Sequence, residues 1–149
     1  MILLDTNVLS ELMRPAPADA VLRWLDGQPP DGLATTTLCV AELGAGLAVL
    51  PAGARQQDLR ARAATLLSQG FAGRIYGFDL DAAAAYGDLL AMRRRAGRSA
   101  SGFDLLIAAI AHTRNLAVAT RNLGDFEGCG LRLLNPWDDP TPTPAPALA

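Results

Sequence analysis

The sequence predicts an α/β fold in which a short central parallel sheet is covered by helices on both faces. Three observations support this prediction. Short apolar segments alternate along the chain with longer helical patterns, which is the order that builds a parallel sheet. Half of the 149 residues are hydrophobic, so a sizeable core is expected. The length fits one domain, which we place at 1–138, followed by a flexible proline- and alanine-rich tail at 139–149.

Five apolar segments are the predicted strands, and six helical patterns lie between them. The predicted strands are 2–4, 32–37, 74–78, 116–120 and 130–136. The predicted helices are 6–13, 18–27, 37–50, 54–70, 81–96 and 101–115. Prolines and glycines set the helix ends: Pro15 follows the first helix, Gly27 closes the second and Gly97 closes the fifth. Thr36 or Thr37 is expected to cap the third helix.

The segment 33–50 is apolar and long enough to be mistaken for a membrane span. Glu42 lies at its centre and three threonines lie near its start, and a carboxylate inside a span is costly. We therefore expect a helix of a water-soluble domain that is buried nearly all round. The N-terminus has no basic region before its first apolar run, so we expect no signal peptide and a cytoplasmic protein.

The composition excludes several kinds of active site. All 13 basic residues are arginines, which excludes sites that need a P-loop or Schiff-base lysine. His112 is the only histidine, so sites that need several histidines, such as histidine triads and histidine-rich zinc sites, are excluded as well. Cys39 and Cys129 make neither a Cys-x-x-Cys site nor a disulfide framework, and we expect two buried thiols. The net charge of −2 argues against binding nucleic acid through bulk positive charge.

Three carboxylates occupy positions where apolar side chains are expected. Asp5 follows the first strand, Glu42 lies among apolar and small residues, and Asp104 precedes the hydrophobic segment LLIAAIA. A carboxylate buried alone is costly, so buried acids are paired, protonated or bound to metal. Asp5 also lies at the carboxyl end of a strand, where ligands collect in parallel sheets. Together the acids favour a site for a hard divalent cation such as Mg²⁺.

A fourth candidate acid follows the predicted strand 116–120. Asp125 lies just beyond this strand, at the same edge of the sheet as Asp5. Thr120 and Asn122 are placed to hydrogen-bond the carboxylates or a bound water. The alternative for Asp125 is a solvated loop acid before a glycine-rich turn.

Two of these acids also have a purely structural explanation. Asp5 is well placed to cap the helix that begins at Thr6, because Asp is a favoured N-cap residue. Asp104 follows Ser101 by three residues, which is the spacing of a capping box. Capping accounts for each of them taken alone. Glu42, in the middle of a helix with no basic neighbour in sequence, has no such explanation.

Four segments, in this order along the chain, resemble the PIN domain, and specifically the VapC- and FitB-like toxins of type II toxin–antitoxin systems. The segments are LLDTNVLSEL, the helix around Glu42, FDLLIAAIA and ATRNLGDF, and the ending LNPWD is also similar. The resemblance covers residues 1 to about 138. It implies a three-layer α/β/α fold and an endoribonuclease that depends on Mg²⁺ or Mn²⁺.

The resemblance also implies which residues hold the metal. Asp5, Glu42 and Asp104 match the acids of the metal site, and Asp125 matches a less constant fourth acid. Some members carry an acid where Asn122 stands, so the fourth position is left open between the two. The chemistry agrees, because a chain without lysine or a reactive histidine pair must take its nucleophile from water. A divalent cation makes hydroxide accessible near neutral pH.

The supporting residues follow from the same resemblance. Thr6 and Asn7 match the residues that orient the first aspartate, and Thr120 matches the polar residue near the fourth acid. An arginine run closes the helix 81–96 and offers candidate contacts to RNA phosphates. These candidates are Arg93, Arg94 and Arg98, beside Arg95. The alternative is that the run complements the helix dipole and stays solvated.

The resemblance implies a homodimer and an antitoxin partner of the VapB or FitA kind. RNA is the implied substrate, operator DNA is contacted only through the antitoxin, and no membrane association is expected. The alternative function is a non-catalytic module that binds the antitoxin and helps it to repress their operon. A dinucleotide-binding enzyme is disfavoured because GAGLAVLPAG does not fit G-x-G-x-x-G. A dehalogenase-like phosphatase would need Asp-x-Asp, whereas position 7 is Asn.

Overall fold

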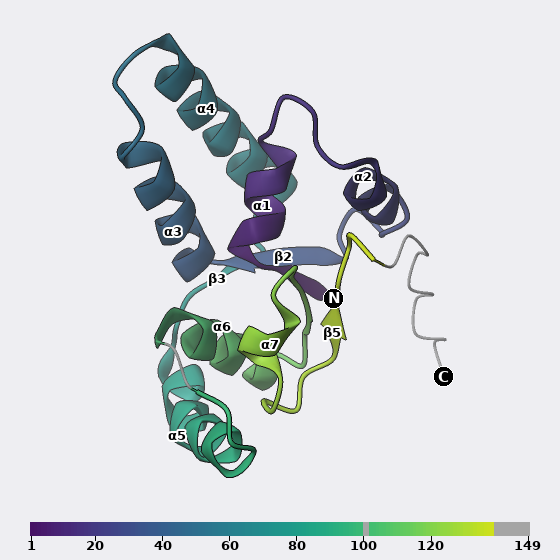
Figure 1. The fold of residues 1–149 in the computed structure, drawn as a ribbon, viewed down its shortest axis with the longest axis vertical. Coiled ribbons are helices and arrows are strands. Elements are labelled where there is room, and N and C mark those ends of the chain that lie inside the picture. Colours follow the sequence, from purple (N-terminus) through teal and green to yellow (C-terminus); the bar gives the residue numbers. More distant parts are fainter. Residues whose placement is uncertain (100–101, 139–149) are drawn as a thin grey trace.

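The computed structural model describes residues 1–99 and 102–138 and contains one parallel sheet with the strand order β3-β2-β1-β4-β5 (Figure 1). The strands are β1 (Ile2–Leu4), β2 (Leu33–Thr36), β3 (Ile75–Tyr76), β4 (Ala117–Ala119) and β5 (Leu133–Leu134). Each lies inside one of the predicted segments, so the predicted fold class is confirmed. The predicted tail 139–149 and Ser101, the proposed capping-box partner of Asp104, lie outside the described residues.

The helices form the two outer layers. They are α1 (Thr6–Leu12), α2 (Asp19–Asp26), α3 (Thr37–Ala48), α4 (Ala54–Thr65), the π-helical η1 (Leu66–Gly70), α5 (Leu80–Arg95), α6 (Gly102–Thr113) and α7 (Leu123–Phe126). In Figure 1, α1, α3 and α4 lie on one side of the sheet, and α5, α6 and α7 lie on the other. Helix α7 was not predicted, because its four residues are too few to show a helical period.

The register of the central strands brings two predicted site residues together. Leu4 of β1 is paired with Ala119 of β4, and both are fully buried. The Asp5 N–H donates to the Ala119 carbonyl at 3.0 Å, and the Thr120 N–H donates to the Leu134 carbonyl at 2.9 Å. Asp5 and Thr120 therefore emerge side by side at the carboxyl edge of the sheet, as expected for parallel strands.

Helix α3 differs from the prediction of a helix buried nearly all round, which is wrong. Cys39, Leu43 and Leu47 are buried on one face. The exposed residues of α3 are Thr37, Ala41, Gly44, Ala45, Gly46 and Ala48. Alanine and glycine raise the hydropathy of the segment without needing burial, which explains the error. Among residues 1–99 and 102–138, no helix is long and apolar enough to cross a membrane.

Candidate metal centre

Asp5 is buried at the end of β1, with 5% of its surface exposed, and both of its carboxylate oxygens accept hydrogen bonds. The Thr6 N–H donates to Oδ1 at 2.8 Å, so the predicted helix cap is confirmed. Asn7 Nδ2 and the Thr120 hydroxyl donate to Oδ2 at 3.0 and 2.7 Å. Asn7 also donates to Thr120 Oγ1 at 3.0 Å. The three predicted supporting residues therefore fix the orientation of this carboxylate.

The other two acids lie close enough to act on Asp5. Burial raises the pKa of the Asp5 carboxyl, the charges of Asp104 and Glu42 raise it further, and the hydrogen bonds from Thr120 and Thr6 work in the opposite direction. The net pKa shift is upward. The structure thus brings carboxylates from the end of β1, from α3 and from α6 to one pocket.

A pocket of about 510 Å³ opens over these acids. Its lining consists of Asp5, Thr6, Asn7, Ser10, Glu11, Arg14, Glu42, Asp104 and Asn122. The Thr6 hydroxyl donates to Glu42 Oε2 at 2.5 Å, which holds Glu42 toward the first aspartate. The lining fits a divalent cation, because it contains four acids, of which Glu11 is paired with Arg14, and a hard cation binds several carboxylate oxygens.

Ser10, Glu11 and Arg14 belong to this pocket, although the sequence analysis did not select them. They follow Asn7 at helical spacings of three, four and seven residues, so that spacing was the available signal. Glu11 is buried, and it accepts hydrogen bonds from the Ala18 N–H at 2.8 Å and from Arg14 at 3.2 Å. Unlike Asp5, Glu11 has a lowered pKa, because these hydrogen bonds and the Arg14 charge outweigh its burial.

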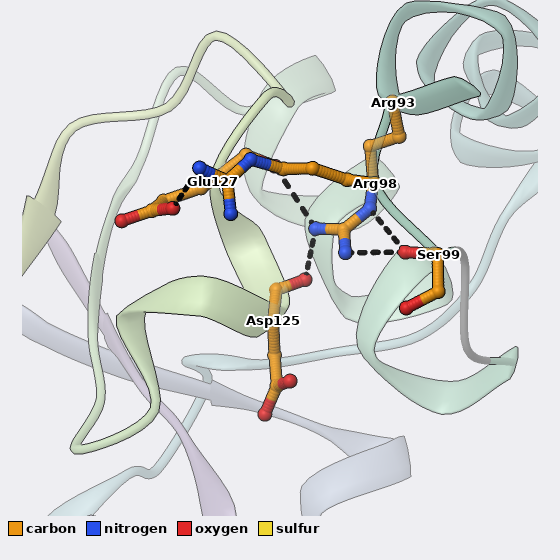
Figure 2. Close-up of polar contacts among 5 residues, drawn as sticks. All are labelled: Arg93, Arg98, Ser99, Asp125 and Glu127. Atoms are coloured by element: carbon orange, nitrogen blue, oxygen red, sulfur yellow. Dashed lines mark hydrogen bonds and ion pairs between the residues drawn. The ribbon is translucent and has the colours of Figure 1, made fainter. Parts of the chain in front are cut away.

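The two candidates for the fourth position differ in where they lie. Asn122 lines the pocket, and its N–H donates to Thr120 Oγ1 at 3.1 Å. Asp125 lies in α7 and is exposed, and its side chain is not among those that line this pocket. Figure 2 shows the Asp125 carboxylate pointing away from Arg93, while its backbone carbonyl faces that residue.

Arg93 does not have the position predicted for an RNA contact, and this prediction is wrong. The residue is 4% exposed. Its guanidinium donates to the carbonyls of Ser99, Asp125 and Glu127, as Figure 2 shows, with Nε to Ser99 and Nη1 to Glu127 both at 3.0 Å. These bonds tie the end of α5 to α7 and to the segment before α6. A guanidinium held by three carbonyls is structural.

The other arginines of the run are on the surface. Arg94 and Arg95 are exposed. Arg98 forms an ion pair with Glu127 at 2.5 Å (Figure 2). An exposed ion pair of this kind does not prevent Arg98 from meeting an anion, because such pairs are weak. Arg94 and Arg98 therefore stay predictions as RNA contacts.

Both cysteines are free and buried, as predicted. Burial raises the pKa of the Cys39 thiol and of the Cys129 thiol, so neither is a thiolate nucleophile near neutral pH. The Cys39 thiol also lies beside two of the acids. Its Sγ and one carboxylate oxygen from each of Asp5 and Glu42 all lie within 4.8 Å of one another.

Comparisons with known proteins agree with this architecture. A family model described as the PIN domain matches residues 2–127. The plasmid stability protein StbB of Pseudomonas syringae pv. tomato is 46% identical over 138 residues, covering 93% of this chain and 99% of that protein. The VapC ribonuclease Y4jK of Sinorhizobium fredii is 43% identical, with the same coverage of both chains. The crystal structure of FitAcB from Neisseria gonorrhoeae contains a chain with a TM-score of 0.86 and 38% identity, covering 93% of this chain and 99% of that one.

Proposed function

Because this chain belongs to the PIN-domain family, we propose that it is the toxin of a toxin–antitoxin pair and cleaves RNA with the help of Mg²⁺ or Mn²⁺. The observation that carries the proposal is the convergence of Asp5, Glu42 and Asp104 on one open pocket. The similarity to a protein named as a VapC ribonuclease supports the nuclease activity. The similarity to a Neisseria gonorrhoeae protein named as toxin FitB, which is 39% identical over 139 residues, supports the toxin role.

Asp5 and Asp104 would hold the cation, and Glu42 would complete the site and orient a water. When bound, the cation lowers the pKa of a bound water, so that hydroxide is available to attack a phosphodiester. The chain supplies the orientation: Thr6, Asn7 and Thr120 fix the Asp5 carboxylate, and the Thr6 hydroxyl also fixes Glu42. Such outer contacts are worth roughly 10- to 100-fold in metal affinity or activity.

The fourth position of the site lies between Asn122 and Asp125, and the pocket lining favours Asn122. An amide at this position offers a neutral oxygen where a carboxylate would add a charge. A second cation would then be bound more weakly than the first.

The partners in this proposal are an antitoxin of the VapB or FitA kind, a second copy of the chain in a homodimer, and RNA. Operator DNA is reached through the antitoxin, and the protein acts in the cytoplasm. A cationic side chain of the antitoxin would be suited to block this pocket, because Asp5, Glu42 and Asp104 all line it.

The test is cleavage of a mixed pool of small RNAs by antitoxin-free protein with Mg²⁺, Mn²⁺ or EDTA. We expect metal-dependent cleavage that Asp5→Asn abolishes, because asparagine retains the helix cap but removes the charge. Asp81→Asn, at an exposed acid of the first turn of α5, is the matched control and should cleave normally.

Equal cleavage by wild type and Asp5→Asn would contradict the site assignment. Neither cleavage nor metal binding by calorimetry would instead favour the second candidate function, a non-catalytic module that binds the antitoxin. Metal binding without cleavage would keep the metal site and direct the search to a narrower set of RNA targets.

A further inference from the structure

A buried thiol adjoins the acids of the candidate metal centre, and the proposed nuclease reaction does not use it. Cys39 lies in the first turn of α3 and has no exposed surface. Its sulfur forms, with oxygens of Asp5 and Glu42, a group of three ligand atoms from two elements, all within 4.8 Å of one another. Sulfur contributes nothing to Mg²⁺ binding, because Mg²⁺ selects oxygen ligands.

The helix cap fixes the position of this sulfur. The Thr36 hydroxyl accepts a hydrogen bond from the Cys39 N–H at 3.1 Å and donates one to the Cys39 Sγ at 3.2 Å. Glu42 follows Cys39 by three residues on α3, so both side chains lie on one face of the helix. The same face meets Asp5 at the end of β1, whose carboxylate is held by Thr120. A threonine hydroxyl therefore holds each of the three ligands: Thr36 holds Cys39, Thr120 holds Asp5 and Thr6 holds Glu42.

We propose that Cys39, Asp5 and Glu42 form a binding site for thiophilic divalent cations such as Zn²⁺, and that an ion bound there competes with Mg²⁺ for the two carboxylates. The competition rests on the proposed function, in which Asp5 and Glu42 serve the catalytic cation. The binding itself rests only on the three ligands. The competition for Asp5 and Glu42 would make Zn²⁺ an inhibitor of the nuclease.

The ligand set suits Zn²⁺ chemically. Zinc binds cysteine sulfur at about 2.3 Å and carboxylate oxygen at about 2.0–2.2 Å, and open sites use three protein ligands and a water. Those bond lengths place tetrahedral ligands roughly 3.5 Å apart. Separations of up to 4.8 Å therefore have to shorten by at most about 1.3 Å when the ion binds. On binding, the S–H bond breaks, the sulfur lone pair forms the S–Zn bond, and the proton passes to solvent without any change of oxidation state.

The second cysteine provides a matched control. Cys129 is also a free buried thiol. The charge that acts on it is that of Arg93, which repels a cation. In the part of the chain that the structure describes, Cys129 belongs to no group of three potential metal ligands.

The first experiment uses the metal-free full-length chain and Co²⁺, which replaces Zn²⁺ and absorbs in the near ultraviolet when bound to thiolate. We expect a sulfur-to-cobalt charge-transfer band in the wild type and in Cys129→Ser, and none in Cys39→Ser. If the wild type binds Co²⁺ by calorimetry without this band, the proposal is overturned. The wild-type spectrum decides this even if Cys39→Ser does not fold.

The second experiment measures the affinities for Zn²⁺ and Mn²⁺ by calorimetry. Nearly any set of protein ligands binds Zn²⁺ more tightly than Mn²⁺, so the informative quantity is the ratio of the two affinities. Outer-shell contacts alone change metal affinity by roughly 10- to 100-fold, so loss of a direct ligand in Cys39→Ser should lower this ratio by at least about 10-fold. Cys129→Ser should not change it.

An unchanged ratio in Cys39→Ser would overturn the proposed zinc site while leaving the catalytic metal centre intact. Failure of the wild type to bind Mn²⁺, with Co²⁺ still bound through sulfur, would instead contradict the proposed function and keep the zinc site. The two proposals therefore fail separately, and neither experiment depends on RNA cleavage.

Discussion

Two buried charges in this protein have similar exposure and opposite surroundings. Arg93 is 4% exposed and Asp5 is 5% exposed. The Arg93 guanidinium is matched by three backbone carbonyls (Figure 2), whereas burial and then the charges of Asp104 and Glu42, which line the same pocket, raise the pKa of Asp5. A buried charge whose hydrogen bonds are made by the fold itself needs no ligand from outside. Asp5 is hydrogen-bonded as well, but it shares a pocket with two further acids, and a hard cation binds several carboxylate oxygens, which is why the second cluster indicates a function.

The largest expected effect concerns the two candidate acids that differ most in position. Asp104→Asn should lower the rate of RNA cleavage by about 10³-fold, the scale of losing a group that acts in the transition state. Asp125→Asn should lower it by less than about 10-fold, below the range of an outer contact, because this acid is exposed and does not line the pocket. Cleavage rates at saturating Mn²⁺ measure both. Equal losses would place Asp125 in the site.

A related change sharpens the assignment of the fourth position. Asn122→Asp adds a carboxylate to the pocket lining and should strengthen Mn²⁺ binding, as calorimetry would measure. A variant with unchanged affinity would show that the side chain at position 122 does not reach the cation.

The second-largest effect tests the Arg93 junction. Arg93→Ala removes the charged donor from the carbonyls of Ser99, Asp125 and Glu127 and should lower the free energy of unfolding by about 3 kcal/mol or more. Arg94→Ala, at the exposed neighbour, should change it by less than about 0.5 kcal/mol. Urea denaturation with a constant m-value measures both. Similar values for the two variants would mean that the carbonyls find other donors.

This junction also shows what the sequence cannot predict. The strands and most helix ends follow from local patterns, because apolar runs and helix caps are visible in the sequence. Local patterns identified Asp5, Glu42 and Asp104 as unusual acids, and the family resemblance assigned them to one site. The partners of Arg93 are backbone carbonyls. Every residue has one, so the residue types in the sequence do not show which carbonyls Arg93 contacts. Arg93 therefore looked the same as Arg94 in sequence, although one is buried and the other exposed.

A smaller effect concerns the pH dependence of the metal-free protein. The folded-state pKa of Asp5 is raised above its ordinary value of 3.8, so the folded state binds more protons than the unfolded state just above that pH. The stability contributed by Asp5 is thus fully present below pH 3.8 and is lost as the pH rises through the folded pKa.

Asp5→Asn cannot ionise at this position, and asparagine caps a helix as well as aspartate. In EDTA, the variant should therefore become more stable than the wild type as the pH rises, and Mn²⁺ should stabilise only the wild type. Thermal unfolding at several pH values measures this. A stability difference that does not depend on pH would mean that Asp5 carries no raised pKa.

The smallest effect concerns substrate binding, since burial excludes Arg93 as a contact to RNA. Arg14 lines the pocket, its side chain is 64% exposed, and Glu11 holds its guanidinium at 3.2 Å. Arg14→Ala should weaken binding of single-stranded RNA and lower the slope of log K against log salt by about 0.7, the value of one lost phosphate contact. Arg23→Ala, on the exposed face of α2, is the control and should leave the slope unchanged. The same titration with Arg94→Ala tests the arginine run. If Arg94→Ala lowers the slope and Arg14→Ala does not, the bound RNA extends from the pocket along α5 and not along α1.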